Sequence, residues 1–177
     1  KKAFQFLHST DPRTKRDGEG YIPSDQLFVF SPDSQKIFFK KAKRFTRSEM
    51  MVMDMLSTND WKRPIYFAVT IGNDYHLGLD PYLELTGMAY RITPERSKDG
   101  RPRVNTEVMY DNMLNKFKYG NMHVPGIYID ENTMRMCRTH RMMFLDLIEA
   151  LYQEGKYDKC LEVLDFAEQV LPGYNIS

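Results

Sequence analysis

The sequence has little net charge, few cysteines and no long hydrophobic run, and each shortage excludes a class of protein. Its 25 basic and 24 acidic residues leave a net charge of +1, so no strong field attracts nucleic acid or a membrane surface. Two cysteines are too few for a disulfide framework. The apolar runs are far shorter than the roughly 20 residues that cross a bilayer. Composition therefore leaves the cellular compartment open.

Sequence motifs that mark enzymes and metal sites are also missing. The chain has no Gly-x-Gly-x-x-Gly loop, no P-loop, no Gly-x-Ser-x-Gly elbow and no His-Glu-x-x-His pair. Neither Cys137 nor Cys160 lies in a Cys-x-x-Cys frame, so Cys160 is expected to be a small buried hydrophobe rather than a nucleophile. We therefore predict no catalytic residue, no metal site and no cofactor.

What is present suits a folded domain. Apolar residues make up 42% of the 177 residues and aromatic residues 13%, which is enough for a core. After a charged loop over residues 8–26, two short strands are expected at Gln26–Phe30 and Lys36–Lys41. Turn-forming residues separate them at Ser31–Ser34, so the segment predicts a β-hairpin.

The middle of the chain predicts a buried helix followed by a buried strand. Thr46 and Glu49 have the Ser/Thr-x-x-Glu spacing of a capping box, which starts a helix that runs to about Ser57. The residues of this helix are apolar on nearly every side, so the helix is expected to be buried. Residues Ile65–Ile71 are apolar without alternation, as in a central strand covered on both faces. Another strand is expected within Tyr82–Ile92.

The last part of the chain is predicted to be helical. Asn105 or Thr106 caps a helix that Gly120 stops. Four apolar residues line this helix at helical spacing: Tyr110, Met113, Leu114 and Phe117. From about Asn132 onward the chain is expected to be wholly helical.

Residues Arg141–Tyr174 resemble a tetratricopeptide repeat, whose period is about 34 residues. Gly155 and Tyr157 fall at the turn between its two helices, and Cys160 takes a small-residue position that faces the first helix. Ile148 departs from the pattern, because Gly or Ala normally stands there. The packing face of the first helix is expected to contain Phe144, Leu147 and Leu151.

These elements predict the α+β class. A small mixed sheet packed by helices is followed by a C-terminal tetratricopeptide-like helical hairpin. We expect an α+β domain over residues 1–130 and the helical hairpin over residues 131–177.

The loop after the Ile65–Ile71 strand holds the candidate binding residues. Ligands often bind where the chain leaves such a strand. A divalent metal held by Asp74, His76, Asp80 and Glu84 is one alternative, but their spacing matches no ligand motif and a plain polar loop explains the same residues. The predicted ligand-binding residues are Asp74, Tyr75, His76, Asp80 and Tyr82.

Aromatic residues of this region are expected either to stack on sugar rings or to pack in the core. Trp61 lies between the apolar helix and the apolar strand, and Pro64 biases Arg63 toward an extended conformation. We therefore predict that Trp61, Arg63 and Pro64 form a structural hub at this junction. The aromatic residues concerned are Trp61, Tyr66, Tyr75, Tyr82 and Tyr90.

Basic and aromatic residues alternate within residues Lys36–Phe45. Such a segment can hold single-stranded nucleic acid or face anionic lipid headgroups, and a strand with a solvated lysine face has the same composition. The near-neutral net charge favours the solvated strand, so no nucleic acid partner is predicted.

Several segments together resemble a family of large membrane proteins of Gram-negative bacteria, the protein O-mannosyltransferase-like family. Asn59, Trp61 and Arg63–Ala68 match its Asn-x-Trp-x-Arg-Pro-Ile-Tyr-Phe-Ala segment. The resemblance covers almost the whole chain, although His76 interrupts one motif. Further matching segments are Tyr75–Leu79, Gly87–Pro94, Met109–Phe117, Gly120–Met122 and Asp11–Lys15.

The resemblance implies a context for the chain. Family members have a multi-spanning N-terminal half that resembles lipid-phosphosugar-dependent glycosyltransferases, followed by a soluble region outside the cytoplasm. The chain is then expected to belong to that soluble region, on the periplasmic side of the inner membrane, and to reach the membrane through the missing N-terminal half. The catalytic acids of the family belong to the membrane half, so none is assigned here.

Three functional hypotheses follow. The first is a non-catalytic module that binds acceptor polypeptide or glycan. The second is an assembly scaffold that binds a protein partner through the tetratricopeptide-like surface. The third is an independent hydrolase or metal enzyme that uses the acidic residues and the histidine of the loop after the strand.

Overall fold

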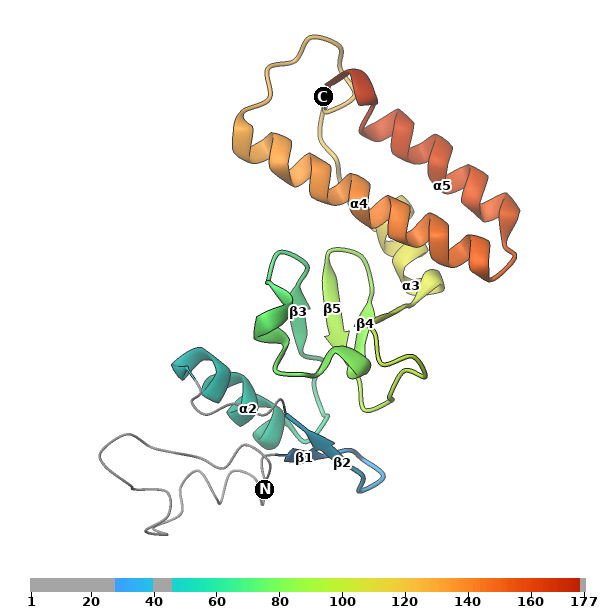
Figure 1. Cartoon of the computed structure of the whole chain (residues 1–177). Coiled ribbons are helices and arrows are strands. Elements are labelled where there is room, and N and C mark those ends of the chain that lie inside the picture. The colour runs from blue at the N-terminus through green and yellow to red at the C-terminus, as the bar shows by residue number, and fades with distance from the viewer. Residues whose placement is uncertain (1–27, 40–45, 176–177) are drawn as a thin grey trace. The chain divides into compact units, whose positions relative to one another are not determined.

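The computed structural model describes residues 28–39 and 46–175 of the chain (Figure 1). These residues form short strands and helices, which confirms the predicted α+β class. The chain divides into two compact units, one of Lys1–Leu83 with Arg91–Arg103 and the other of Glu84–Tyr90 with Val104–Ser177. The domain boundary expected between residues 130 and 131 stays a prediction.

The first described element is the β-hairpin that the sequence predicted. Strands β1 (Phe28–Phe30) and β2 (Lys36–Phe38) pair antiparallel, with Phe28 opposite Phe38. The turn between them closes through a hydrogen bond from the Ser34 amide to the Ser31 carbonyl at 3.0 Å. The predicted strand ends at residues 26–27 and 40–41 lie outside the described residues.

Helix α2 (Arg47–Asn59) starts at the predicted capping box. The Thr46 amide donates to Glu49 Oε2 at 2.7 Å, and the Glu49 amide donates to Thr46 Oγ1 at 3.3 Å. The expectation that this helix is buried all round is wrong, because Met51 is 65% and Met55 47% exposed. Packing covers the other side of the helix only, and composition alone does not show which apolar residues a partner covers.

The expected central strand over Ile65–Ile71 is also wrong. Strand β3 contains only Tyr66–Ala68, and it lies at one edge of a four-stranded sheet of order β3-β5-β4-β6. Phe67 is its one buried side chain. The Ile71 amide donates to the Ala68 carbonyl at 3.0 Å, so the chain turns immediately after the strand. An apolar run has the same composition in a buried strand as in a short edge strand with an apolar turn.

The single strand expected within Tyr82–Ile92 is instead a pair of strands. Strands β4 (Leu83–Leu85) and β5 (Ala89–Ile92) are joined by a tight turn. The Thr86 amide donates to the Ala89 carbonyl at 3.1 Å, and Gly87 adopts φ +133°. The short turns η4 (Asn73–His76) and η5 (Asp80–Tyr82) precede β4, and β6 (Arg103–Val104) completes the sheet.

Helix α3 (Thr106–Asp111) starts at Asn105, whose side chain accepts a hydrogen bond from the Val108 amide at 3.1 Å. The expected continuation to Gly120 is wrong, because the helix widens into one π-helical stretch, η6 (Asn112–Lys116), and ends there. At the start of that stretch the Asn112 side chain donates to the Thr86 carbonyl at 2.7 Å, a tertiary bond that helical spacing does not reveal.

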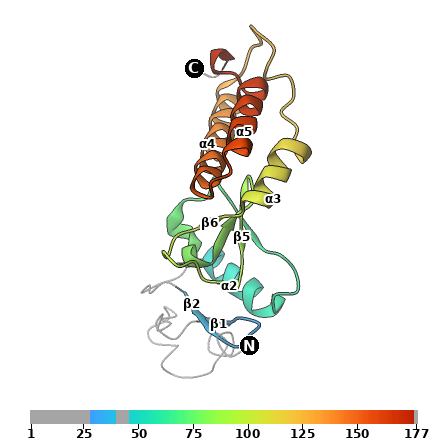
Figure 2. The ribbon, with the colours of Figure 1, turned by 90° about the vertical axis from the view of Figure 1, so that its right-hand side faces the viewer.

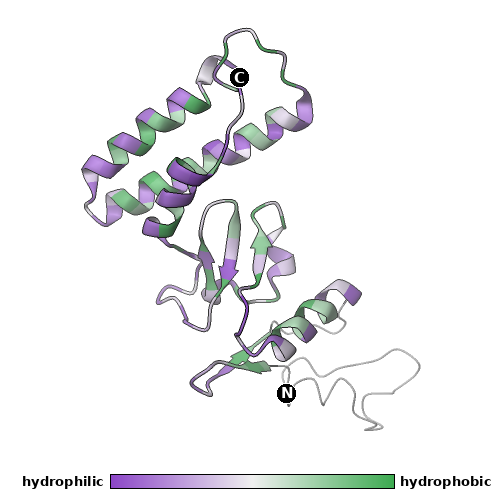
Figure 3. Cartoon of the chain, turned by 180° about the vertical axis from the view of Figure 1, so that it is seen from behind, coloured by the Kyte–Doolittle hydropathy of each residue, from purple (hydrophilic) through white to green (hydrophobic). Residues whose placement is uncertain are grey.

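The predicted C-terminal helical hairpin is confirmed. Helices α4 (Glu131–Gln153) and α5 (Tyr157–Val170) lie side by side, and the short turn η7 (Gly173–Asn175) follows (Figures 1 and 2). Both helices alternate between hydrophobic and hydrophilic residues (Figure 3). Within the described residues no helix has both the length and the apolar character that crossing a membrane requires. The packing face of α4 contains three fully buried side chains, as expected: Phe144, Leu147 and Leu151.

Cys160 supplies a test of the packing between α4 and α5. It is 8% exposed, and its Sγ lies 3.5 Å from the Ile148 carbonyl oxygen. We expect Cys160→Ala to be nearly neutral, because alanine also fits, and Cys160→Leu to lower the free energy of unfolding by about 1–3 kcal/mol through overpacking. Chemical denaturation measures both values. A leucine variant as stable as the parent would mean that the two helices do not approach closely at this residue.

An ion-pair network joins the start of α3 to the turn between α4 and α5. Lys156 Nζ lies 2.6 Å from Glu107 Oε1 and 2.7 Å from Glu154 Oε2. Lys159 Nζ lies 3.0 Å from Glu107 Oε2. Hydrogen bonds from Lys156 lower the pKa of both carboxyl groups below 4.5, and the bond to Glu107 raises the pKa of Lys156 above 10.5.

The stabilisation from this network therefore depends on pH. A carboxylate with a lowered pKa stabilises the fold above pH 4.5, and that contribution is lost as the pH falls through its folded-state pKa. A lysine with a raised pKa stabilises the fold below pH 10.5 and loses its contribution as the pH rises through its folded-state pKa. We expect Glu107→Gln to lower the melting temperature at neutral pH, and the difference from the parent to shrink as the pH falls below 4.5 and through the lowered pKa of Glu107. Asp165→Asn, on an exposed position of α5, is the control; a gap that persists in acid would contradict the assignment.

Candidate functional site

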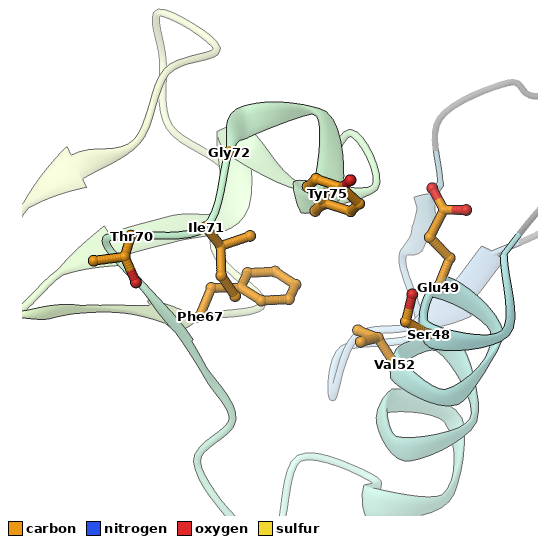
Figure 4. A pocket seen from close by; sticks show the side chains of 8 residues that line it. All are labelled: Ser48, Glu49, Val52, Phe67, Thr70, Ile71, Gly72 and Tyr75. Carbon is orange, nitrogen blue, oxygen red and sulfur yellow. The ribbon is translucent and has the colours of Figure 1, made fainter.

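A pocket of about 350 Å³ lies between the first turns of α2 and the segment that leaves β3 (Figure 4). Its volume is at the lower end of the range of roughly 300–1,000 Å³ that small-ligand sites span. The pocket therefore suits one side chain or one small ring with its neighbours. Its lining consists of Ser48, Glu49, Val52, Phe67, Thr70, Ile71, Gly72 and Tyr75.

Local structure explains why these residues meet. The capping box fixes the first turn of α2, and Val52 follows Ser48 and Glu49 by four and three residues, which places all three on one side of the helix. On the opposite wall, the Tyr75 amide donates to the Gly72 carbonyl at 2.9 Å and so folds η4 back beside β3. The side chains of Phe67, Ile71, Tyr75 and Val52 consequently point into the same hollow (Figure 4).

The chemistry of the lining suits binding. Its surface is mostly apolar, with hydroxyl groups at Ser48 and Thr70, and Glu49 is the one charged side chain among the described residues of the lining. Glu49 is 8% exposed, and its carboxylate accepts hydrogen bonds from the Thr46 amide and from Thr46 Oγ1 at 2.7 and 2.9 Å. The described lining residues contain no histidine, cysteine or lysine.

The structure brings only one of the five predicted ligand-binding residues to this pocket. Tyr75 lines it and is 57% exposed. His76 is buried, with Nδ1 at 2.9 Å from Asp80 Oδ1 and its ring stacked on Phe67 at 5.4 Å between centroids. The pair of His76 and Asp80 thus lies behind the pocket wall, because Phe67 contacts the imidazole and also lines the pocket.

Asp74 and Tyr82 lie apart from the pocket lining. Asp74 is exposed on η4, and Tyr82 is half-buried at the end of η5. The Tyr82 carbonyl accepts from the Thr93 amide at 2.8 Å and from Thr93 Oγ1 at 3.2 Å, which ties η5 to the end of β5. Ligand contacts by these two residues stay predictions.

The residues proposed for a metal do not converge in the structure. His76 pairs with Asp80, Asp74 is exposed, and Glu84 is buried in β4. Within residues 28–39 and 46–175, no three histidine, cysteine, aspartate or glutamate side chains gather closely enough to hold a metal ion. The arrangement therefore gives the metal-enzyme hypothesis no support.

The three residues of the predicted hub follow the C-terminal end of α2. Trp61 Nε1 donates to the Phe30 carbonyl at 2.6 Å and so connects the end of α2 to β1. Arg63 and Pro64 are exposed and line a more open hollow of about 480 Å³. The role of the three residues as a hub stays a prediction. Of the aromatic residues considered for sugar stacking, Tyr75 alone lines the pocket of Figure 4.

Sequence reasoning missed most of the pocket. Glu49 was recognised only as a helix cap, and Ser48 and Val52 were treated as ordinary helix residues. These residues face Tyr75 across a tertiary contact between α2 and η4, which no local pattern reveals. The signal that did apply was the exit of the Ile65–Ile71 strand, where ligands often bind and where Tyr75 lies.

Comparison with protein-family models matches residues 23–112 to TMEM260-associated domain 2. The match covers α2, β3 and every residue that lines the pocket. Searches of curated proteins and of solved structures find no significant match. The matched segment is just over half of the 177 residues. The chain therefore belongs to the family of TMEM260-associated domain 2, which makes it a domain of a membrane-associated protein.

Proposed function

We propose that the chain is a non-catalytic module of a multi-spanning, protein O-mannosyltransferase-like membrane protein, and that it binds the acceptor, a polypeptide or a glycan. The observation that carries this proposal is the pocket between α2 and η4, with its apolar walls, exposed tyrosine ring and single carboxylate. Membership of a family associated with membrane proteins supports the context. In this proposal the chain lies on the periplasmic side of the inner membrane.

The pocket favours binding over catalysis for two reasons. Glu49, the one acid among the described residues of the lining, is held by the capping bonds at the start of α2, so it is poorly suited to exchange protons with a substrate. The nearby imidazole of His76 is buried behind Phe67 and hydrogen-bonded to Asp80. Tyr75 in contrast offers an exposed aromatic face, which both sugar rings and peptide side chains use for contact.

A matched pair of tyrosine variants tests the proposal. Peptide and glycan arrays probed with the 177-residue chain identify the ligand, and calorimetry then compares Tyr75→Ala with Tyr152→Ala. Tyr152 is 64% exposed on α4 and lies outside the pocket lining, so it controls for the loss of a surface ring. We expect Tyr75→Ala to weaken binding by about tenfold or more and Tyr152→Ala to leave it unchanged. Unchanged binding by Tyr75→Ala, or no ligand on either array, would contradict the proposal.

A second candidate function, an assembly scaffold, rests on the outer surface of the helical hairpin. The rings of Tyr152 and Tyr157 lie 5.3 Å apart, where α4 ends and α5 begins. A tetratricopeptide-like hairpin cannot bury its own faces, so such a surface suits a protein partner. The exposed apolar side chains, each 51–64% exposed, are Met142, Leu145, Tyr152, Tyr157, Leu161 and Leu164.

Site-specific crosslinking tests the scaffold. A photoreactive amino acid at Leu161 in the full-length membrane protein is expected to give one discrete crosslinked species, and the same group at Asp165 is the control. Loss of that species in a Leu164→Glu background would support an apolar interface. Equal labelling from both positions would mean that the hairpin surface contacts no specific partner.

A further inference from the structure

We infer that the exposed side of α2 lies against a lipid bilayer that contains anionic headgroups. Five side chains, which we call the α2 face, form this surface: Arg47, Met51, Met55, Lys62 and Arg63. None of them lines the pocket of Figure 4, so the inference goes beyond the proposed function. Three observations carry it: an exposed apolar row, basic residues at both ends of that row, and membership of a family associated with membrane proteins.

The apolar row runs along one side of α2. Arg47, Met51 and Met55 follow one another at intervals of four residues, which places them on the same side of the helix. Met51 is 65% and Met55 47% exposed, whereas Met53 and Leu56 are buried on the other side. The middle of α2 is hydrophobic and its ends are hydrophilic (Figure 3). Methionine is unbranched and flexible, so these side chains adapt to an irregular apolar environment such as the boundary of a bilayer.

Basic residues stand at both ends of the row. Arg47 is exposed in the first turn of α2, and Lys62 and Arg63 are exposed just after the last turn. Met55, Lys62 and Arg63 border the same open hollow of about 480 Å³, so the apolar row continues directly into its basic end. Each lysine or arginine close to an anionic bilayer strengthens binding by about fivefold at low salt. The long stems of these residues also let the charge reach the headgroups while apolar neighbours go deeper.

The acids beside this face do not remove its cations. Asp54 lies on α2, and Asp60 follows the end of the helix. Lys62 Nζ lies 3.5 Å from Asp60 Oδ2, but the two side chains are 78% and 75% exposed. An ion pair this exposed contributes little, so the Lys62 ammonium group can exchange it for a lipid phosphate.

A bilayer fits this surface better than a protein partner does. Two methionine side chains and three cations fall short of the roughly 800 Å² that each side of a stable protein interface buries. A bilayer requires less, because a domain of a membrane-associated protein is already held near lipid, where weak contacts act at a high effective concentration. A second copy of the same face would bring cations against cations, which disfavours self-association as well.

Vesicle co-sedimentation tests the inference on the 177-residue chain. The probes are vesicles of phosphatidylcholine alone and vesicles of phosphatidylcholine with phosphatidylglycerol, both at low salt. Lys62→Gln combined with Arg63→Gln removes the charge at one end of the face, and Met51→Ser removes its most exposed apolar side chain. Circular dichroism melts verify that each variant folds, and Arg47→Gln replaces the double variant if that one melts early.

Each variant has a matched control away from the α2 face. Lys98→Gln combined with Arg101→Gln removes an exposed lysine and an exposed arginine from the loop between β5 and β6. Met142→Ser removes a methionine that is 55% exposed on α4. The controls separate binding by this face from a general effect of charge or of surface methionine.

We expect the parent to bind the phosphatidylglycerol vesicles about tenfold or more tightly than the neutral vesicles, and to lose most of that binding as salt is added. Both variants of the face should weaken binding by about fivefold or more, and both controls should bind as the parent does.

No binding of the parent to anionic vesicles would overturn the inference, as would unchanged binding by either variant of the face or an equal loss in the controls. Self-association that depends on Met51, seen by sedimentation velocity without vesicle binding, would assign the face to a second copy and overturn it too. All these results leave the proposed function standing, because the arrays and the Tyr75 variant test the pocket separately.

Discussion

Phe144→Ala is expected to lower the free energy of unfolding by about 3–5 kcal/mol, the range for large aromatic residues in a core. Phe144 is 1% exposed in the middle of α4. Its ring lies 5.7 Å from that of Tyr119 and 6.2 Å from that of Phe166 between centroids, so it joins α5 and the segment after α3 in one aromatic cluster. Removing it leaves a cavity that three separate segments would have to close.

The adjacent residue supplies the control. Leu145 is 58% exposed, so Leu145→Ala should change the free energy of unfolding by no more than about 0.5 kcal/mol. Chemical denaturation of the two variants measures the difference. Similar losses for both, or a loss below about 1 kcal/mol for Phe144→Ala, would mean that the cluster is not the core of the helical hairpin.

Gly87→Ala is expected to lower the free energy of unfolding by about 2–5 kcal/mol, because it adds both backbone strain and overpacking. Gly87 has φ +133° in the turn between β4 and β5. A Cβ atom there would lie 2.9 Å from Cζ of Phe117, closer than such contacts ordinarily come. The side chain would therefore have to displace the Phe117 ring, which packs beneath the turn.

Two further variants separate the two causes. Gly100 also has a positive φ, +76°, but no atom lies within 4 Å of a Cβ added there. Gly100→Ala therefore introduces backbone strain without a steric clash, and it should lower the free energy of unfolding by less than Gly87→Ala does. Adding Phe117→Leu to Gly87→Ala should recover part of the stability by making room. A loss for Gly87→Ala no larger than that for Gly100→Ala would show that the contact with Phe117 is unimportant.

Helix starts and turns were the elements that the sequence predicted best, because they depend on residues close together in the chain. The capping box of Thr46 and Glu49 and the cap at Asn105 are both present in the structure. The hairpin of β1 and β2 and that of α4 and α5 are present as well. Each of these features is decided within a few residues, where side-chain chemistry and backbone preference act together.

The strands were predicted poorly because burial depends on partners far along the chain. An unbroken apolar run at Ile65–Ile71 indicated a central strand, but only Tyr66–Ala68 pairs, and at the edge of the sheet. Ile71, beyond the strand, instead lines the pocket. The apolar residues of this run therefore line the pocket as well as the core. A pocket wall and a core both need apolar residues, so the composition does not distinguish them.

The candidate site was likewise predicted only in part. The sequence directed attention to the loop after β3, and Tyr75 of that loop lines the pocket. His76 and Asp80 were grouped with it because they are neighbours in sequence, but the structure buries the His76 side chain, which pairs with the half-buried Asp80. The opposite wall comes from α2, more than twenty residues earlier, and its contribution is set by tertiary packing that local patterns do not encode.

A map of amide chemical shifts tests most directly whether the pocket between α2 and η4 is the binding site of this domain. The chain is titrated with the ligand that the peptide and glycan arrays identify and is followed by two-dimensional amide NMR. We expect the largest shifts to fall on Ser48–Val52 and on Thr70–Tyr75, with the shifts of α4 and α5 unchanged. Shifts confined to the exposed apolar face of α4 and α5, with the pocket unaffected, would contradict it.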